Sequence, residues 1–587
     1  MHLEPLRPAE AEQLLAGLLG HAAGIELDAI SDIARLCAYL PLALRIAAAR
    51  LTEQPERGIV WLRDELAGDD RLGALEMQGV SGIAVRAAFD LSYRRLAPET
   101  QRLFVLLGLI PGADFSVEGV AALADIPVSD ARRELATLAG AHLIRARRDR
   151  RYDFHDLIRE YAQTLAADFD ERDAAYDRLY AWMCACVEAA AQRLYPSIAR
   201  LPQWIPHGST IEINLDLSDN DHATKWLDHE LSGLIAAIRD GERNRHGDAV
   251  IHLASALRGH LIGHATLPEW LAIGEAALSA ASHAGDLRAE AAAQINIAIA
   301  HASRDDYPRA IEHLESARFL SKRSGWLAGE LTSSGNLGKI YWRIGEIASA
   351  HAAYRHVIQT SHTQGLPVVT ATMIANIAEL LVYMDRPVES LERTAEAIAI
   401  FDRFGGPINL ADAYDNYAVA YQQVGDYERA EFYATKAVSI FQQTGDLTSE
   451  AVVLAHLSTI TNDQGRRGDA WALANRAVAV ARDVGQDRVE ALTLNAAAAL
   501  HIADADGESA RRMASRACTL AVRVGARRVE IEALINLACA HRLLGEFETS
   551  AELAKRAYDI AEPLGFVGLA RTAAALLDDP KPGSAQD

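Results

Sequence analysis

Glycine recurs in this chain every 40 residues, and this period constrains the fold more than any other feature of the sequence. Eight glycines keep the spacing without a slip: Gly285, Gly325, Gly365, Gly405, Gly445, Gly485, Gly525 and Gly565. A second ladder lies halfway between them, at Gly345, Gly425, Gly465 and Gly545, with Asp305 and Asp385 in two of its gaps. A third ladder consists of Asn296, Asn336, Asn376, Asn416 and Asn536. Three ladders with one period predict a solenoid of repeated structural units.

Each 40-residue unit has the pattern of two amphipathic helices joined by a short turn. At Leu331 to Ile344 and at Ser349 to Ser361, small and apolar residues recur at helical spacing, as they do on one face of a helix. Glycine at a turn accepts the left-handed backbone conformation that ends a helix. The ladders therefore predict seven helix pairs between residues 286 and 565, since (565 − 285)/40 = 7.

Residues 416–430 carry a more specific signal. Asn416 is followed by Tyr417, Ala418, Val419, Ala420 and Tyr421, and then by Gly425, Asp426, Tyr427 and Ala430. This stretch resembles the tetratricopeptide repeat, whose small residues let paired helices pack closely and whose aromatic residues fill the gap between neighbours. The resemblance implies an α-solenoid that binds other molecules. We expect the residues beyond the usual unit of about 34 to lengthen the helices.

The array is predicted to fill most of the C-terminal half of the chain. We assign it residues 246–577, with about eight units of 40 residues and a cap. A degenerate unit, Asp248 to Gly285, precedes the seven regular units and has Trp270 in its second helix. The cap is expected at Leu569 to Leu577, because the terminal element of a solenoid shields the last helix pair. The tail at 578–587 contains Pro and Gly and is expected to be disordered.

The first helix of each unit is expected to line the concave side of the array. Twelve polar or aromatic residues share this position in the repeat: Lys339, Trp342, Arg343, Glu379, Tyr383, Asp412, Asp415, Gln422, Gln423, Asn462, Asp463 and Arg542. A groove with aromatic, cationic and acidic groups suits a peptide or a flexible protein segment. The alternative is that these residues are ordinary solvated positions on the helices.

Three further domains are predicted before the array: a helical subdomain at 1–80, a winged-helix domain at 81–167 and a helical linker at 168–245. The elements of the second are, in order, helices at Val85–Tyr93, Pro98–Leu107, Ser116–Leu123 and Ser129–Gly140, extended runs at His142–Arg147 and Arg151–Phe154, and a helix at Asp156–Ala166. A helix-turn-helix followed by a β-hairpin predicts the winged helix, with Ser116 as a helix N-cap. The fold class is therefore mainly α, with a small β-wing.

Two motifs resemble those of NB-ARC proteins, the nucleotide-switch members of the STAND ATPase class. Residues 39–44, Tyr-Leu-Pro-Leu-Ala-Leu, resemble the "GLPLAL" motif, and residues 154–157, Phe-His-Asp-Leu, resemble the "MHD" motif. Their order, followed by tetratricopeptide repeats, is most similar to actinobacterial regulators of the AfsR/SARP family. The resemblance implies that Pro41 packs on an adenine and that His155 contacts the β-phosphate of bound ADP. The alternative is that Pro41 starts a helix and His155 caps one.

One part of the NB-ARC pattern is missing. The phosphate-binding loop, G-x-x-x-x-G-K-[ST], has no match, since the only Gly-Lys pair, Gly338-Lys339, is followed by Ile340. The chain therefore resembles the lid and sensor half of a switch whose ATPase core lies upstream or acts in trans. We expect no ATP hydrolysis, no enzyme activity and no cofactor in this chain alone, and ADP or ATP binding only with such a core.

A basic hairpin offers a second hypothesis. Arg145, Arg147, Arg148, Arg150 and Arg151 lie on the predicted wing, and Arg132 and Arg133 lie on the helix before it. Such a surface can contact DNA phosphates. The chain as a whole has a net charge of −22, which repels nucleic acid, so a contact with acidic neighbours in the same protein is the favoured interpretation.

The remaining sequence features are those of a cytoplasmic protein without a metal site. No signal peptide or membrane span is evident, the five cysteines are too few for a disulfide framework, and the 20 histidines show no H-E-x-x-H or clustered Cys/His spacing. We therefore predict a signal-sensing, protein- or peptide-binding regulatory module of a STAND-type transcriptional regulator. The alternatives are a DNA-binding factor acting through the winged helix and a plain tetratricopeptide scaffold.

Overall fold

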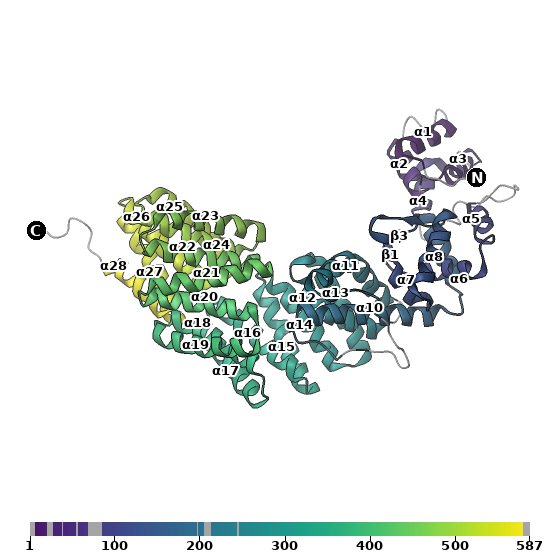
Figure 1. The fold of residues 1–587 in the computed structure, drawn as a ribbon. Coiled ribbons are helices and arrows are strands. Elements are labelled where there is room, and N and C mark those ends of the chain that lie inside the picture. The colour runs from purple at the N-terminus through teal and green to yellow at the C-terminus, as the bar shows by residue number, and fades with distance from the viewer. Residues whose placement is uncertain are drawn as a thin grey trace, which may run out of the picture. The chain divides into compact units, whose positions relative to one another are not determined.

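The computed structural model describes residues 6–19, 27–37, 39–53, 57–67, 85–196, 198–202, 204, 213–243 and 246–578. The chain forms two compact units, Met1–Ala280 and Ala281–Asp587 (Figure 1). The predicted tail lies almost wholly outside the described residues. Within the part of the chain that is described, no helix combines the length and the apolar character needed to cross a membrane.

The N-terminal unit is built from helices and one small sheet. Its helices are α1 (Pro8–Leu19), α2 (Leu27–Leu36), α3 (Pro41–Glu53), α4 (Gly58–Leu66), α5 (Val85–Tyr93), α6 (Pro98–Leu107), α7 (Val117–Ala124), α8 (Val128–Gly140), α9 (Asp156–Ala166), α10 (Arg172–Leu194), α11 (Asn220–Arg243), α12 (Gly247–His264) and α13 (Leu267–Ala284), within which the second unit begins. Its strands are β1 (Asp114–Ser116), β2 (Arg145–Ala146) and β3 (Arg151–Asp153). The strands pair antiparallel in the order β1-β3-β2, so Tyr152 lies opposite both Phe115 and Ala146.

Local sequence explains the elements around this sheet. Ser116 ends β1 and caps α7, since its Oγ accepts a hydrogen bond from the backbone N–H of Gly119 at 3.3 Å. The predicted hairpin is present as β2 and β3, joined by a single 3₁₀ turn at Arg148–Arg150. Strand β1 was not predicted. It has three residues and is recognised only by its pairing with β3.

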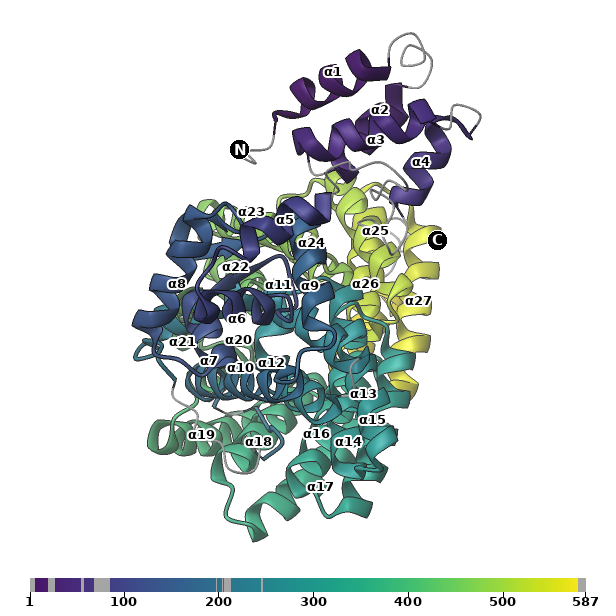
Figure 2. The same ribbon diagram turned by 90° about the vertical axis from the view of Figure 1, so that its right-hand side faces the viewer.

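Helix α10 connects the sheet-containing part of the unit to α11 and α12. It packs against α7, α11 and α12, and Figure 2 shows α10 and α12 side by side. The centre of α10 is accordingly buried on several faces, including Tyr180, Trp182 and Cys186. The segment predicted as a linker thus contributes to the core of the N-terminal unit.

The C-terminal unit is a mainly helical, tetratricopeptide-like solenoid. Its helices are α14 (Leu287–Ala302), α15 (Tyr307–Ser324), α16 (Leu327–Arg343), α17 (Ile347–Thr363), α18 (Pro367–Tyr383), α19 (Pro387–Phe404), α20 (Pro407–Gln423), α21 (Tyr427–Thr444), α22 (Leu447–Asp463), α23 (Arg467–Val484), α24 (Asp487–Ala503), α25 (Gly507–Arg523), α26 (Arg527–Leu543), α27 (Phe547–Leu564) and α28 (Val567–Asp578). Helices α14 to α27 form seven pairs, each packed against the next, and α28 packs against α27 and α26.

The two turn ladders have left-handed backbones throughout. The eight glycines of the first ladder have φ between 66° and 84°. In the second ladder the four glycines, Asp305 and Asp385 also have positive φ, and so does Ala505, which occupies the one position that the sequence ladder left empty. A positive φ is therefore common to the turns of all seven units, and three units adopt it within the helix pair without glycine.

The solenoid completes one coil after five units. The sixth and seventh units and the cap begin a second coil, which lies against the first three units. The backbone N–H of Arg488, at the start of α24, lies 3.4 Å from Oδ2 of Asp305, which is 183 residues earlier. Arg571 of α28 forms an ion pair with Asp385, with Nη2 2.9 Å from Oδ1 across 186 residues. Between these two contacts, Gly345 packs against Arg527 at the start of α26. The turns of the first three units thus contact the helix starts of the sixth unit, the seventh unit and the cap.

Candidate ligand groove of the helical array

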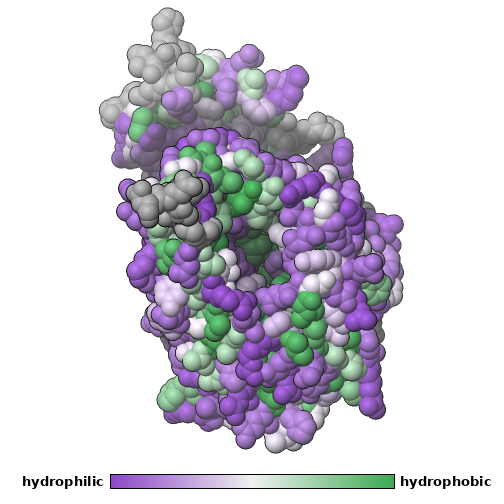
Figure 3. All heavy atoms as spheres, turned by 90° about the vertical axis from the view of Figure 1, so that its left-hand side faces the viewer, coloured by the Kyte–Doolittle hydropathy of each residue, from purple (hydrophilic) through white to green (hydrophobic). Residues whose placement is uncertain are grey.

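The first helices of the units form the inner layer of the solenoid. Helices α14, α16, α18, α20, α22, α24 and α26 each contact the next one in this series. Two members of the asparagine ladder join neighbours in this layer: Asn416 Nδ2 donates to the Ala375 carbonyl at 3.0 Å, and Asn536 Nδ2 donates to the Asn495 carbonyl at 3.2 Å. Figure 3 shows a hollow at the middle of the face formed by this part of the chain.

A group of charged and aromatic side chains from five inner helices lies close together, and we call it the inner cluster. Its members are Lys339 and Trp342 of α16, Glu379 and Tyr383 of α18, Asp412 and Asp415 of α20, His456 of α22, and Arg528 and Glu532 of α26. Six of the twelve predicted groove residues belong to it. Its three further members, His456, Arg528 and Glu532, were not predicted.

Trp342 and Tyr383 form the aromatic part of the inner cluster. The Trp342 Nε1–H donates to Oε1 of Glu379 at 2.9 Å. The ring centroids of Trp342 and Tyr383 are 5.1 Å apart, and Phe566, from the last turn of the array, lies 5.6 Å from Trp342. Trp342 is buried, with 7% of its surface exposed, whereas Tyr383 is half-buried. Of the two, Tyr383 is the one that a ligand can contact directly.

The side chain of Arg528, in the seventh unit, contacts the third unit. Its Nη1 donates to the Tyr383 hydroxyl at 3.0 Å and to Oε1 of Glu532 at 2.6 Å. The guanidinium carbon also lies 4.8 Å from the centroid of the Tyr383 ring, within the range of a cation–π interaction. Burial raises the pKa of the Tyr383 hydroxyl, although Arg528 opposes the shift. The closure of the solenoid thus places a cation and an aromatic ring at one point of the inner surface.

Asp415 and His456 form a charged pair between neighbouring units. The Nδ1 atom of His456 is 2.9 Å from Oδ1 of Asp415. Desolvation, the largest single influence, lowers the pKa of His456, but the charge and the hydrogen bond of Asp415 together outweigh it, so the pKa is raised above its ordinary value. The pair therefore favours an imidazolium facing a carboxylate.

Asp412 is the most perturbed acid of the inner cluster. Desolvation raises the pKa of Asp412 to about 7; Asp415 and Glu379 add to the shift, and Lys339 opposes it. The side chain is nevertheless partly exposed, as expected for a group that lines a hollow rather than a packed core. A carboxyl group in this state is a candidate ligand contact, because a perturbed acid in a cleft is often functional.

The other six predicted groove residues lie outside the inner cluster. Gln422 Nε2 donates to Oδ2 of Asp463 at 2.7 Å and so joins two neighbouring units. Asn462 accepts a hydrogen bond from Arg467, and the Arg542 guanidinium lies 5.9 Å from the Phe547 ring centroid. The remaining two are Gln423, which is exposed, and Arg343, which is half-buried. All six come from the C-terminal ends of inner helices, next to the turns.

The two residues predicted to face a nucleotide are both found at helix starts. Pro41 is the first residue of α3, and His155 is the N-cap residue of α9. His155 is buried, and burial together with the charge of Arg145 lowers its pKa to about 4. A neutral imidazole at a helix N-terminus can donate a hydrogen bond to an anion. These positions are compatible with nucleotide contact and equally with plain helix starts.

Most of the basic hairpin is paired within the protein. Arg145 and Arg147 both bind the buried carboxylate of Asp153, with Nε–Oδ distances of 2.9 and 2.7 Å. Arg151 is almost buried and pairs with Asp114 and with Glu230 of α11. The expected contact with acidic neighbours is therefore confirmed for these three arginines. Arg148 and Arg150 remain exposed on the turn.

Comparisons with known proteins agree with this architecture. A model of the tetratricopeptide repeat family matches residues 369–443, which lie in α18 to α21. The regulatory protein AfsR of Streptomyces coelicolor is 27% identical over 441 residues, which are 71% of this chain and 42% of that protein. AfsR of Streptomyces griseus is 27% identical over 487 residues, 80% of this chain and 47% of that protein. This chain is similar to the AfsR regulatory proteins.

The AfsR match confirms the resemblance inferred from the motifs and repeats. The chain spans about half the length of the AfsR proteins that it matches. Two solved structures align with lower similarity. A STAND protein with a tetratricopeptide repeat sensor from Pyrococcus horikoshii aligns with 98% of this chain and 70% of its own, at 14% identity and a TM-score of 0.35. A Rap protein complexed with competence and sporulation factor aligns with 57% of this chain and 99% of its own, at 14% identity and a TM-score of 0.43.

Proposed function

We propose that this AfsR relative is a ligand-sensing regulatory module that binds a peptide or an extended protein segment at the inner cluster, and that it acts by binding rather than by catalysis. The observation that carries the proposal is the set of partly exposed charges on the inner helices. Lys339, Asp412 and Tyr383 come from three consecutive units and all retain contact with solvent. A peptide groove needs such polar groups beside apolar surface.

The mixture of charges suits a segment that itself carries both signs. Arg528 and His456 can bind a carboxylate, and Glu379 and Asp412 can bind an ammonium or guanidinium group. Because Arg528 contacts Tyr383 across the closure of the solenoid, a ligand that competes for either side chain changes the contact between the seventh and the third unit. Such a ligand shifts a conformational equilibrium only if it binds the two states with different affinity.

The N-terminal unit is proposed to receive this signal. We interpret α6 to α9 with the three-stranded sheet as a winged helix that acts as a rigid part of a STAND-type switch. Pro41 and His155 are then the lid contacts for ADP, whose phosphates are held by an NB-ARC ATPase core upstream or in trans. DNA binding by the winged helix is the weaker hypothesis, because Arg145, Arg147 and Arg151 are occupied by internal ion pairs.

A peptide selection tests the groove proposal. A displayed library of random 12-residue peptides is panned on the immobilised full chain, and the enriched peptides are synthesised and titrated calorimetrically. We expect Asp412→Ala to weaken their binding at least about tenfold, which corresponds to about 1.4 kcal/mol. Gln423→Ala is the matched control, because Gln423 is exposed on the same helix, α20, but lies outside the inner cluster. Enriched peptides that bind both variants as tightly as the wild type would place the binding surface elsewhere.

A further inference from the structure

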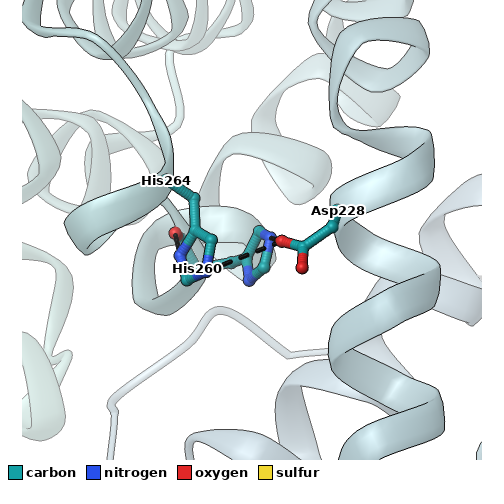
Figure 4. Close-up of side chains that lie close together, drawn as sticks. All are labelled: Asp228, His260 and His264. Carbon is teal, nitrogen blue, oxygen red and sulfur yellow. Dashed lines mark hydrogen bonds and ion pairs between the residues drawn. The ribbon is translucent and has the colours of Figure 1, made fainter. Parts of the chain in front are cut away.

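Three side chains with metal-ligating atoms meet between α11 and α12 in the N-terminal unit. Asp228 of α11 faces His260 and His264 of α12 (Figure 4). Their ligand atoms all lie within 4.8 Å of one another. Oδ1 of Asp228 is 3.1 Å from Nε2 of His260 and 3.6 Å from Nε2 of His264. No other group of three such residues was found in the described part of the chain.

Helix geometry places the two histidines on one face. Residues four apart on a helix are neighbours, and the imidazole rings of His260 and His264 stack with centroids 4.1 Å apart and an angle of 13° between their planes. Because α11 packs against α12, Asp228 reaches both rings from the adjacent helix. Three polar side chains therefore converge on one point between the two helices.

The hydrogen bonds of the rings orient their Nε2 atoms toward Asp228. The Nδ1 of His264 lies 2.9 Å from the His260 carbonyl oxygen, which can only accept, so Nδ1 carries the proton and Nε2 carries the lone pair. The Nδ1 of His260 lies 3.2 Å from the Tyr195 hydroxyl. Metal-binding histidines commonly use the second nitrogen in this way, because the outer hydrogen bond fixes the tautomer.

His260 provides a second observation that points to a ligand at this place. Its side chain has no exposed surface, and its Nε2 makes no hydrogen bond to any described residue although Oδ1 of Asp228 is 3.1 Å away. The carboxylate oxygen therefore lies off the direction in which the ring nitrogen bonds. A buried polar atom without a hydrogen bond is unfavourable, and an ion between the two groups would satisfy both.

The distances match those between ligands of one ion. Nitrogen and oxygen ligands at about 2.0 Å from a tetrahedral Zn²⁺ are separated by roughly 3.3 Å. The two Asp228–His distances, 3.1 and 3.6 Å, lie on either side of this value.

We propose that Asp228, His260 and His264 bind a divalent transition-metal ion, with Zn²⁺ as the preferred ion. Two imidazoles and one carboxylate favour Zn²⁺ over the oxygen-ligated Ca²⁺ and Mg²⁺. Asp228 and His264 are 44% and 38% exposed, so the fourth position faces solvent and takes a water molecule or a ligand group. The ion joins α11 to α12 and so stabilises the helices that follow α10.

The three residues lie outside any H-E-x-x-H or clustered Cys/His motif, so the sequence prediction of no metal site missed them. The spacing of His260 and His264 by four residues in a helical segment was the available signal. The third ligand is 32 residues earlier in sequence, since 260 − 228 = 32. Only the packing of α11 on α12 reveals it.

The test uses the untagged full chain after removal of metal with a chelator. It is titrated with Zn²⁺ calorimetrically and with Co²⁺ by visible absorption, which reports the coordination geometry. We expect one equivalent of metal to bind. We expect Asp228→Asn and His264→Ala each to weaken binding at least about tenfold, because even the loss of a residue that only hydrogen-bonds to a metal ligand typically has an effect of this size. Both residues are partly exposed, so these variants avoid the fully buried His260.

His229→Ala is the control, since His229 is exposed on α11 next to Asp228 but outside the three-residue group. It should bind Zn²⁺ as the wild type does, and Zn²⁺ should raise the unfolding temperature of both, because an ion that binds only the folded state stabilises it. No stoichiometric binding by the wild type, or equal binding by Asp228→Asn and the wild type, would overturn the proposal. Asp228 and His260 would then form only an interaction between two side chains.

Discussion

Gly345 and Gly425 occupy the same position of the repeat in different surroundings, and this makes them a matched pair for replacement by alanine. Both have a left-handed backbone, with φ of 86° and 83°. A β-carbon at Gly345 comes within 3.0 Å of Cβ of Arg527 and 3.1 Å of Cδ1 of Leu564. A β-carbon at Gly425 meets nothing within 4 Å. Only the first substitution disturbs the contact between the first and the second coil of the solenoid.

The expected magnitudes follow from two separate effects. Alanine in the left-handed conformation costs about 1–2 kcal/mol, and this applies to both positions. Overpacking adds about 1–3 kcal/mol where neighbouring atoms must move, and this applies only to Gly345. We therefore expect Gly425→Ala to lower the free energy of unfolding by about 1–2 kcal/mol and Gly345→Ala by about 2–5 kcal/mol.

Urea unfolding of the full chains, followed by circular dichroism, measures the difference between the variants. Because repeat arrays need not unfold in one step, amide hydrogen exchange at the start of α26 serves as the local readout. Exchange should be faster in Gly345→Ala than in Gly425→Ala. Equal losses of stability, together with unchanged exchange in α26, would refute the contact between the coils.

Three further predictions concern the inner layer. The folded pKa of Asp412, about 7, lies above the unfolded value of about 3.9, so the folded state retains a proton between these values and its stability falls as pH rises through them. Asp412→Asn cannot ionise, and its melting temperature relative to the wild type should therefore be higher at pH 8 than at pH 5. Tyr383→Phe removes one of the two acceptors of Arg528 but keeps the ring, and it should cost about 1.5 kcal/mol in urea unfolding. Asn536→Ala removes the hydrogen bond to the Asn495 carbonyl and should cost about 1 kcal/mol in the same assay.

Features encoded within a few residues could be predicted from the sequence. Helices α5, α6 and α9 have the bounds that the sequence predicted, because caps, prolines and apolar spacing act locally. The glycine ladders located the turns for the same reason. The turn residue Ala505 was not predicted, because its left-handed conformation is imposed by the repeat around it and is uncommon for alanine.

Features that depend on contacts between distant segments could not be predicted. The pairing of Asp305 with the start of α24, and of Asp385 with Arg571, depends on how far the solenoid rotates per unit, which is the sum of many small packing angles. The same rotation brings Arg528 to Tyr383 and so adds Arg528 and Glu532 to the inner cluster. Asp305 and Asp385 break the glycine ladder, and the structure explains both exceptions, because each carboxylate binds a residue of the next coil.

The closure of the solenoid after five units also limits how such a chain can evolve. In an array whose units touch only their neighbours, duplicating one unit leaves every contact intact. Here an extra 40 residues inserted after α19 and before α24 would shift the second coil by one unit. Asp385 would then face Ile531, which is 40 residues before Arg571, and lose its ionic partner. The number of repeats is thereby tied to the ion pair at Asp385, and a change in length requires a compensating substitution there.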